Sequence, residues 1–163
     1  MTEHAPSQIA SVTPAVVAQL LADLGCRAEI GSANGQPMIG SALHGAVFTV
    51  HFGNPQPGSP QEAQYGDLSL VYAPRIDGID PGSALPAWLE AAVAGWNIER
   101  RFARLAVLQG NDGPYLALRW DVLTIAVGRA QLVATLQLWD QLMQEFFLFL
   151  RSRAPLATEA QAA

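Results

Sequence analysis

The C-terminal part of the chain carries an uninterrupted helical pattern that constrains the whole fold. No proline occurs between Gly128 and Arg153, and large apolar side chains recur there at alternating spacings of four and three. They are Leu132, Leu136, Trp139, Met143, Phe146 and Leu150. Because this alternation keeps side chains on one face of a helix, it predicts a long helix over 128–153 with a buried stripe.

A second apolar stripe lies beside the first on the same predicted helix. It consists of Leu138, Leu142 and Phe149, while Asp140 and three glutamines occupy the opposite side. The resulting apolar arc is wider than packing on one sheet requires. Either another element of the chain covers the second stripe, the first helix for example, or a second chain does. We expect these three residues to form a protein-binding or homodimer interface.

Upstream of this helix, the hydrophobic period changes to two, which is typical of strands. Alternating runs lie at 27–30, 37–42, 46–52, 68–72, 102–108 and 115–123. Asn34-Gly35 and His44-Gly45 separate the first three runs, and such pairs favour tight hairpin turns because glycine readily adopts positive φ. In the last run, one row is Leu116, Leu118, Trp120 and Val122. The pattern predicts a sheet with one strongly apolar side.

Two shorter helices complete the expected fold. Thr13 followed by Pro14 marks a helix start, and Gly25 marks its end, which places a helix at 14–24. A second helix is expected from Pro86 to about Trp96. The order of these elements predicts an α+β fold: an antiparallel sheet of about five to six strands, with helices packed on one face and a long C-terminal helix.

The helical and strand patterns end before either terminus of the sequence. We interpret residues 13–153 as a single domain and expect residues 1–12 and 154–163, which are polar and patternless, to be mobile tails. Within the domain, the segment 53–66 contains three prolines and three glycines. It is therefore expected to be a long exposed loop.

Composition narrows the classes of function. The 163 residues are 50% hydrophobic, and all nine basic residues are arginine. The net charge is −5, and this negative charge argues against nucleic acid as the main partner. The absence of lysine excludes a phosphate-loop or Schiff-base lysine. No apolar run approaches the roughly 18 residues of a membrane span. With a single cysteine and no signal-like pattern in the first fifteen residues, we expect a cytoplasmic chain that does not bind membranes.

Candidate chemical residues are few and scattered. His44, His51 and Cys26 are the soft metal ligands outside the N-terminal segment, and their spacing matches no zinc site. The sequence has no Gly-x-Ser-x-Gly elbow, dinucleotide loop or paired carboxylates. We therefore expect no catalytic residues, no cofactor and no metal, with the histidines at surface or turn positions and Cys26 buried.

One basic cluster stands out at the start of the predicted fifth strand. Arg100, Arg101 and Arg104 flank Phe102 and follow Asn97. The simpler interpretation is structural: Asn97 ends the helix, Phe102 enters the core, and the arginines protect an edge strand from pairing. The alternative is a small cationic patch that binds an acidic protein segment.

Several segments, taken in order, resemble one protein family. They are the Thr-Pro…Leu-Leu-x-Asp-Leu-Gly run at 13–25, Trp-Asn-Ile-Glu-Arg-Arg-Phe-Ala-Arg at 96–104, Tyr-Leu-Ala-Leu-Arg-Trp-Asp-Val at 115–122 and Leu-x-x-Trp…Phe-x-x-Phe-Leu at 136–150. Over residues 13–151 the chain resembles the YbjN family, described as bacterial sensory transduction regulators with a fold similar to type III secretion chaperones. Asn97, Arg101, Phe102 and Trp139 carry much of the resemblance, and the proline-rich segment 53–66 departs from it.

The resemblance implies an antiparallel sheet with helices packed on it, a helix-led dimer interface and no catalytic residues. Together with the wide apolar helix face, it predicts a non-catalytic protein-binding module, chaperone-like or regulatory. The alternatives are a purely structural homodimerisation domain, or a small-ligand binder or enzyme with an unrecognised site. For the core, we expect Trp120→Ala and Phe102→Ala each to cost about 3–5 kcal/mol of stability.

Overall fold

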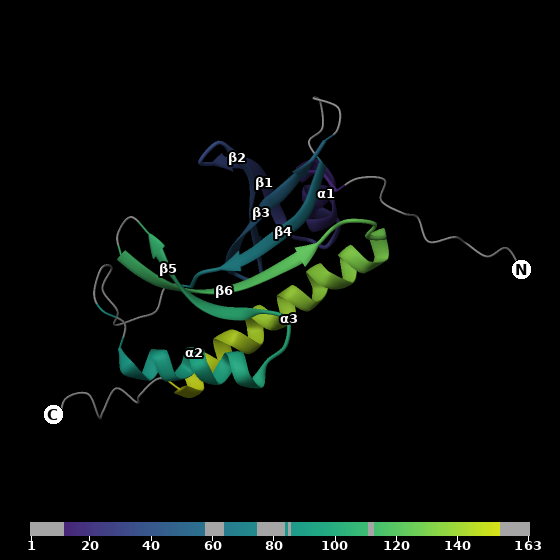
Figure 1. Cartoon of the computed structure of the whole chain (residues 1–163). Coiled ribbons are helices and arrows are strands. Elements are labelled where there is room, and N and C mark those ends of the chain that lie inside the picture. Colours follow the sequence, from purple (N-terminus) through teal and green to yellow (C-terminus); the bar gives the residue numbers. More distant parts are fainter. Residues whose placement is uncertain (1–11, 58–63, 75–83, 85, 111–112, 154–163) are drawn as a thin grey trace, which may run out of the picture.

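The structure is a computed structural model that describes residues 12–57, 64–74, 84, 86–110 and 113–153 (Figure 1). The helices are α1 (Pro14–Asp23), α2 (Ala87–Glu99) and α3 (Arg129–Arg153). The strands are β1 (Arg27–Ala33), β2 (Gln36–Leu43), β3 (Ala46–Gln56), β4 (Gln64–Tyr72), β5 (Arg104–Gly110) and β6 (Gly113–Leu123). Residues 1–11 of the predicted N-terminal tail and the whole predicted C-terminal tail, 154–163, lie outside the described residues.

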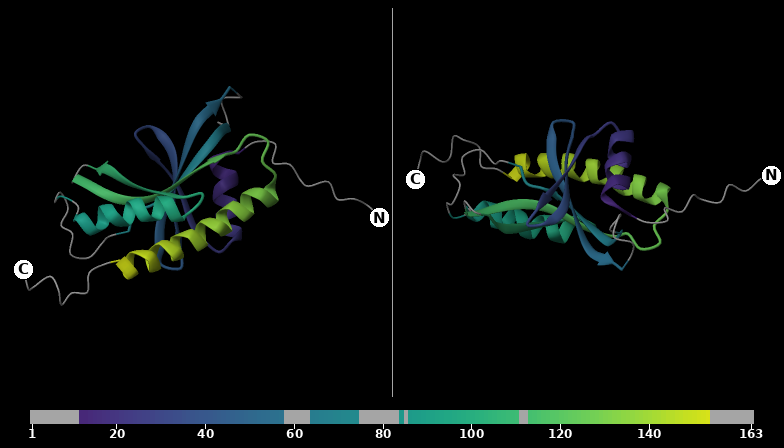
Figure 2. Two further views of the ribbon diagram at one scale, coloured as in Figure 1. Left: turned by 60° about the horizontal axis from the view of Figure 1, so that its bottom comes forward. Right: turned by 90° about the horizontal axis from the view of Figure 1, so that it is seen from above.

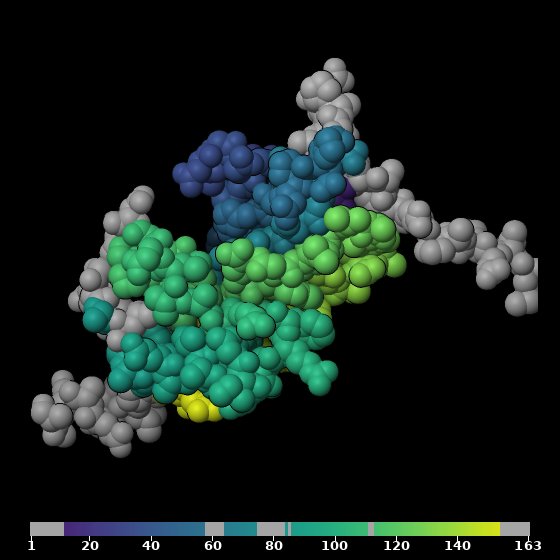
Figure 3. Space-filling view, in the orientation of Figure 1, coloured from purple at the N-terminus to yellow at the C-terminus, as the bar shows by residue number. Residues whose placement is uncertain are grey.

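The strands form one antiparallel sheet in the order β1-β2-β3-β4-β6-β5. The predicted α+β fold is confirmed: helices pack on one face of the open sheet, and α3 runs diagonally along it from α1 to α2 (Figure 2). An ion pair anchors each end of α3, since Arg129 contacts Asp23 of α1 at 2.6 Å and Arg153 contacts Glu99 of α2 at 3.4 Å. In the space-filling view, α2 and β6 hide most of α3 (Figure 3).

The two predicted hairpin turns are present and have the expected backbone. Asn34 and Gly35 join β1 to β2 with φ of 51° and 77°, and His44 and Gly45 join β2 to β3 with φ of 50° and 83°. Positive φ at both central residues gives a turn whose twist matches that of the flanking strands. The alternation of apolar residues along β3 is therefore registered against β2, with Phe48 directly opposite Ser41.

The start of α1 also follows the sequence. The Thr13 hydroxyl accepts a hydrogen bond from the backbone N–H of Val16 at 3.3 Å, and Pro14 occupies the first helical turn. Val12, assigned to a mobile tail by the sequence, is buried, and its carbonyl accepts a hydrogen bond from the N–H of Tyr65 at 3.1 Å. Val12 therefore packs with the core, although it lies one residue before the start of the predicted domain.

The core stripe of α3 is confirmed. All six of its predicted side chains are buried: Leu132, Leu136, Trp139, Met143, Phe146 and Leu150. Aromatic contacts join it to its neighbours, with Phe146 edge-on to Trp96 of α2 (centroids 5.6 Å apart) and to Tyr72 of β4 (6.0 Å). Trp139 contacts Phe48 of β3 at 6.1 Å in the same edge-on geometry. Such pairs add specificity to apolar burial, so α3 links the sheet to α2.

The predicted loop at 53–66 is shorter than expected. The β3–β4 ladder continues through Gly53 opposite Asp67, Pro55 opposite Tyr65 and Gln56 opposite Gln64, and residues 58–63 lie outside the described chain. The pairing of β3 with β2 stops at His51. Beyond that point β3 has one open edge, where a proline can occupy a strand without removing a ladder hydrogen bond.

The segment after α2 corrects the interpretation of Phe102. Asn97 lies inside the last turn of α2, where its amide donates to the carbonyl of Leu105 (3.0 Å) and accepts from the N–H of Leu105 (2.9 Å). Trp96 Nε1 donates to the carbonyl of Ala103 at 3.0 Å. These bonds hold the chain so that Phe102 takes a φ of 69° and is 62% exposed, over a half-buried Trp120. The prediction that Phe102 enters the core was wrong.

We therefore expect Phe102→Ala to change the free energy of unfolding by less than about 1 kcal/mol, because little buried surface is lost. Trp120→Ala should cost more, since most of that residue is removed from water and its ring centroid lies 5.6 Å from that of Phe102. Denaturant melts of the two variants test this order. A loss of about 3 kcal/mol or more for Phe102→Ala would contradict it.

Candidate functional site

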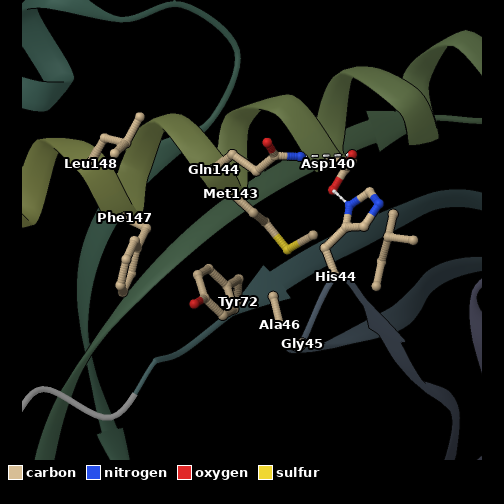
Figure 4. Close-up of a pocket in the computed structure, with 10 residues that line it drawn as sticks. His44, Gly45, Ala46, Tyr72, Asp140, Met143, Gln144, Phe147 and Leu148 are labelled. Carbon is tan, nitrogen blue, oxygen red and sulfur yellow. Dashed lines mark hydrogen bonds and ion pairs between the residues drawn. The ribbon is translucent and has the colours of Figure 1, made fainter.

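A groove lies between the β2–β3 turn and the middle of α3 (Figure 4). His44 stands on the turn, and its ring Nδ1 lies 3.2 Å from Oδ1 of Asp140 on α3. Gln144, one turn further along α3, donates to Oδ2 of Asp140 at 3.0 Å. The positive-φ turn and the helix thus bring together two groups that are 96 residues apart in sequence.

On one side of the His44–Asp140 pair lies a cavity of about 430 Å³, which we call the tyrosine pocket. Its lining comprises Leu43, His44, Gly45, Ala46, Tyr72, Asp140, Met143, Gln144, Phe147 and Leu148. Phe147 and Leu148 are 50% and 66% exposed at its rim. Burial raises the pKa of the Tyr72 hydroxyl. The pocket combines apolar walls with a few polar groups, as ligand and peptide sites do.

A second cavity of about 480 Å³, the cysteine pocket, lies on the other side of the pair. It shares Leu43, His44 and Asp140 with the tyrosine pocket. Its remaining lining is Leu21, Leu24, Cys26, Phe48, Leu136, Gln137, Trp139 and Gln141. The His44–Asp140 pair therefore stands in the wall between two adjoining cavities.

Cys26 is buried, as the sequence predicted. Burial raises the pKa of its thiol, and the negative charge of Asp140 raises it further. The thiolate is the reactive form of cysteine, so these surroundings favour an unreactive thiol.

We expect Cys26 to be alkylated by iodoacetamide at pH 7.5 at least about tenfold more slowly in the folded protein than in the urea-unfolded chain, because both access and thiolate formation are reduced. Mass spectrometry of timed, quenched samples measures the two rates. Equal rates for the folded and unfolded protein would contradict this placement of Cys26.

The structure divides the second stripe of α3. Leu142 and Phe149 are only 5% and 7% exposed within the single chain, and Phe149 contacts the Trp96 ring of α2 at 5.3 Å. Leu138 is partly buried against the core. The sequence left open whether the chain itself or a second chain covers this stripe. Leu142 and Phe149 are covered by the chain itself. The covering helix for Phe149 is α2 and not α1, because α2 packs beside the C-terminal half of α3.

The three arginines of the predicted cationic patch are exposed. Arg100 stacks over Trp96 at 5.7 Å and approaches Glu145 of α3 at 3.8 Å. Arg104 begins the edge strand β5 and lies directly opposite Arg119 of β6. Arg119 is a basic neighbour that the sequence did not assign to the patch, although its alternation along 115–123 placed it on the outer face.

His51 lies on the uncovered face of the sheet, where its Nε2 is 2.9 Å from Thr49 Oγ1. Partial burial lowers the pKa of this imidazole below 6.5, and the nearby charge of Arg119 lowers it further. The unfolded chain therefore binds this proton at a higher pH than the folded chain does. The contribution of neutral His51 to stability is present above the unfolded value and is lost as the pH falls through the folded value.

We expect the native protein to lose stability between pH 7.5 and pH 5, and His51→Gln to lose less over the same range, because glutamine does not titrate. Urea melts at both pH values, with parent and variant in parallel, measure the difference. A larger loss in the variant would contradict the direction of the shift.

The described residues hold no group of three or more histidine, cysteine, aspartate or glutamate side chains placed to bind a metal ion. Nor does any helix in the described part of the chain have the length and apolar character needed to cross a membrane.

Sequence reasoning missed four residues of the groove: Tyr72, Asp140, Phe147 and Leu148. Asp140 was placed on the polar side of α3, which the structure partly corrects, since its side chain is only 18% exposed. A signal for the other two α3 residues was present in the run 146–150, which is entirely apolar. No single helix face holds five consecutive residues, so some of them had to lie outside both stripes.

The fold and groove define a small α+β domain with an open antiparallel sheet and a concave site where a turn meets the long helix. A family model, YbjN, described as a putative bacterial sensory transduction regulator, matches residues 13–152. The chain belongs to the YbjN family. No curated protein and no solved structure shows a significant match to it.

Proposed function

We propose that this chain is a non-catalytic, chaperone-like or regulatory module that acts in the cytoplasm by binding a segment of another protein in the groove beside α3. One observation carries the proposal. Phe147 and Leu148 are exposed on a helix whose other large apolar residues are buried or partly buried, and both line the tyrosine pocket. Exposed apolar side chains that rim a pocket are typical of protein interaction sites.

Two further points support this function. The family is described as a regulator of sensory transduction, and regulators commonly act through protein contacts. The tyrosine pocket is open to solvent and joins apolar walls to the polar groups of His44, Asp140 and Gln144. A buried apolar centre with a polar rim is the usual anatomy of a protein interface.

Affinity capture with the purified chain tests the proposal. We expect the double variant Phe147→Ser with Leu148→Ser to retain at most about one tenth of a partner that the parent captures, since truncating the side chains that anchor an interface costs more than about 1 kcal/mol each. Val47→Ser is the matched control, because Val47 is 68% exposed on β3 outside the groove. Circular dichroism checks that all variants fold.

The homodimer expected from the sequence is the competing function of this surface. If a second copy covers Phe147 and Leu148, light scattering will give a dimer mass for the parent and a monomer mass for the double variant, with capture of other proteins unchanged. If the parent is a monomer and the double variant captures less partner than the parent does, the result supports the binding module. Equal capture by parent and double variant would overturn it.

A further inference from the structure

The two cavities beside α3 form one continuous surface with a charged centre. The tyrosine pocket reaches Leu148 and the cysteine pocket reaches Leu136, so their lining spans about 18 Å of helix at 1.5 Å per residue. Asp140 lies about 6 Å from the Leu136 end of this length and about 12 Å from the Leu148 end, and it lines both cavities. A ligand that occupied both cavities would therefore have to pass over this carboxylate.

Asp140 is poorly matched by its partners within the chain. It is the one carboxylate among the described residues that line the two cavities. Its contacts are the His44 ring at 3.2 Å and the Gln144 amide at 3.0 Å. The His44 side chain is 67% exposed on a turn and can move into solvent. A guanidinium or an ammonium group would bind the carboxylate strongly, because each carries a permanent positive charge at neutral pH and several N–H donors.

We infer that the groove binds an extended segment of a partner protein in which a central arginine or lysine is flanked, two residues away on each side, by apolar side chains. The basic group displaces His44 and pairs with Asp140, and the two apolar side chains enter the tyrosine and cysteine pockets. This inference rests on the proposed function and adds the chemistry of the partner.

The spacing follows from strand geometry. In an extended segment, every second side chain points to the same face, about 6.6 Å from the next. Three such side chains span about 13 Å, which fits within the length of α3 that lines the cavities. The net charge of −5 also favours encounter with a basic segment over an acidic one.

Two fluorescein-labelled peptide probes test the inference by fluorescence anisotropy. The first is Gly-Leu-Ser-Arg-Ser-Leu-Gly, and the second has glutamine in place of the arginine. We expect the parent protein to bind the arginine probe at least about tenfold more tightly, which is the lower end of the range for charged hydrogen bonds. Asp140→Asn keeps the size and should abolish the difference. His44→Ala should bind the arginine probe at least as tightly as the parent does.

Every outcome separates this inference from the proposed function. Equal binding of both probes, or a preference for a third probe with central glutamate, overturns the basic partner and leaves apolar docking in place. If no probe binds at millimolar concentration while captured protein still depends on Phe147 and Leu148, the inference fails and the function stands. If capture is also insensitive to those residues, both fail. Val47→Ser should match the parent with each probe.

Discussion

Replacing Phe146 with alanine is expected to lower the free energy of unfolding by about 3–5 kcal/mol. The side chain is fully buried and contacts two aromatic rings, Trp96 of α2 and Tyr72 of β4. These neighbours belong to different elements, so they cannot close together on the vacated space without moving a helix against the sheet. Urea melts followed by circular dichroism measure the loss.

The next residue supplies a matched control. Phe147 has the same chemistry and the same helix but is 50% exposed. Phe147→Ala should cost less than about 1 kcal/mol, because about half of the residue's surface already contacts water. Similar losses for the two variants would mean that the helix is rotated relative to its placement in the structure.

Leu142→Glu is expected to unfold the chain outright. Leu142 is buried on α3, and a carboxylate placed there would have to lose its hydration without a partner. The cost is comparable with the whole stability of a typical domain, about 5–15 kcal/mol. Far-ultraviolet circular dichroism and light scattering should show loss of helix and aggregation.

Leu148→Glu is the corresponding control on the exposed side, where Leu148 is 66% accessible. That variant should keep the parent's ellipticity and melt within about 1 kcal/mol of it. These two variants also test whether the second stripe of α3 belongs to the core of the chain or to an interface with a second chain. A folded, monomeric Leu142→Glu protein would show that this residue belongs to an interface between chains and not to the core.

The parts of the fold that depend on local patterns could be predicted from the sequence. The spacing from Leu132 to Leu150 defines a helix face, and Asn34-Gly35 defines a turn, because both signals are properties of neighbouring residues. The strand predicted at 102–108 lies at Arg104–Gly110, two residues later, and it is an edge strand, as expected. Where the sequence is periodic, only one placement of the helix or strand buries the apolar row.

The parts that depend on distant contacts could not be predicted. Phe102 looked like a core residue, but hydrogen bonds from Trp96 and Asn97 fix the backbone around it and turn its side chain outward. Pro55 signals a turn, yet the β3–β4 ladder continues through it. The pairing of β3 with β2 has already stopped at His51, so that edge of β3 needs no N–H from Pro55. The groove is the clearest case, since the proximity of His44 and Asp140 exists only once the hairpin packs on α3.

The position of α3 in the chain has a consequence for biosynthesis. Every strand of the sheet precedes this helix in the sequence, yet α3 supplies much of the cover for the sheet's apolar face. During synthesis the six strands can pair before their cover exists, and the row that includes Leu70 and Leu118 then stays open to water. Nascent chains at this stage resemble the aggregation-prone intermediates of larger proteins. Because α3 is synthesised after every strand, its docking on the sheet completes the cover of the apolar face.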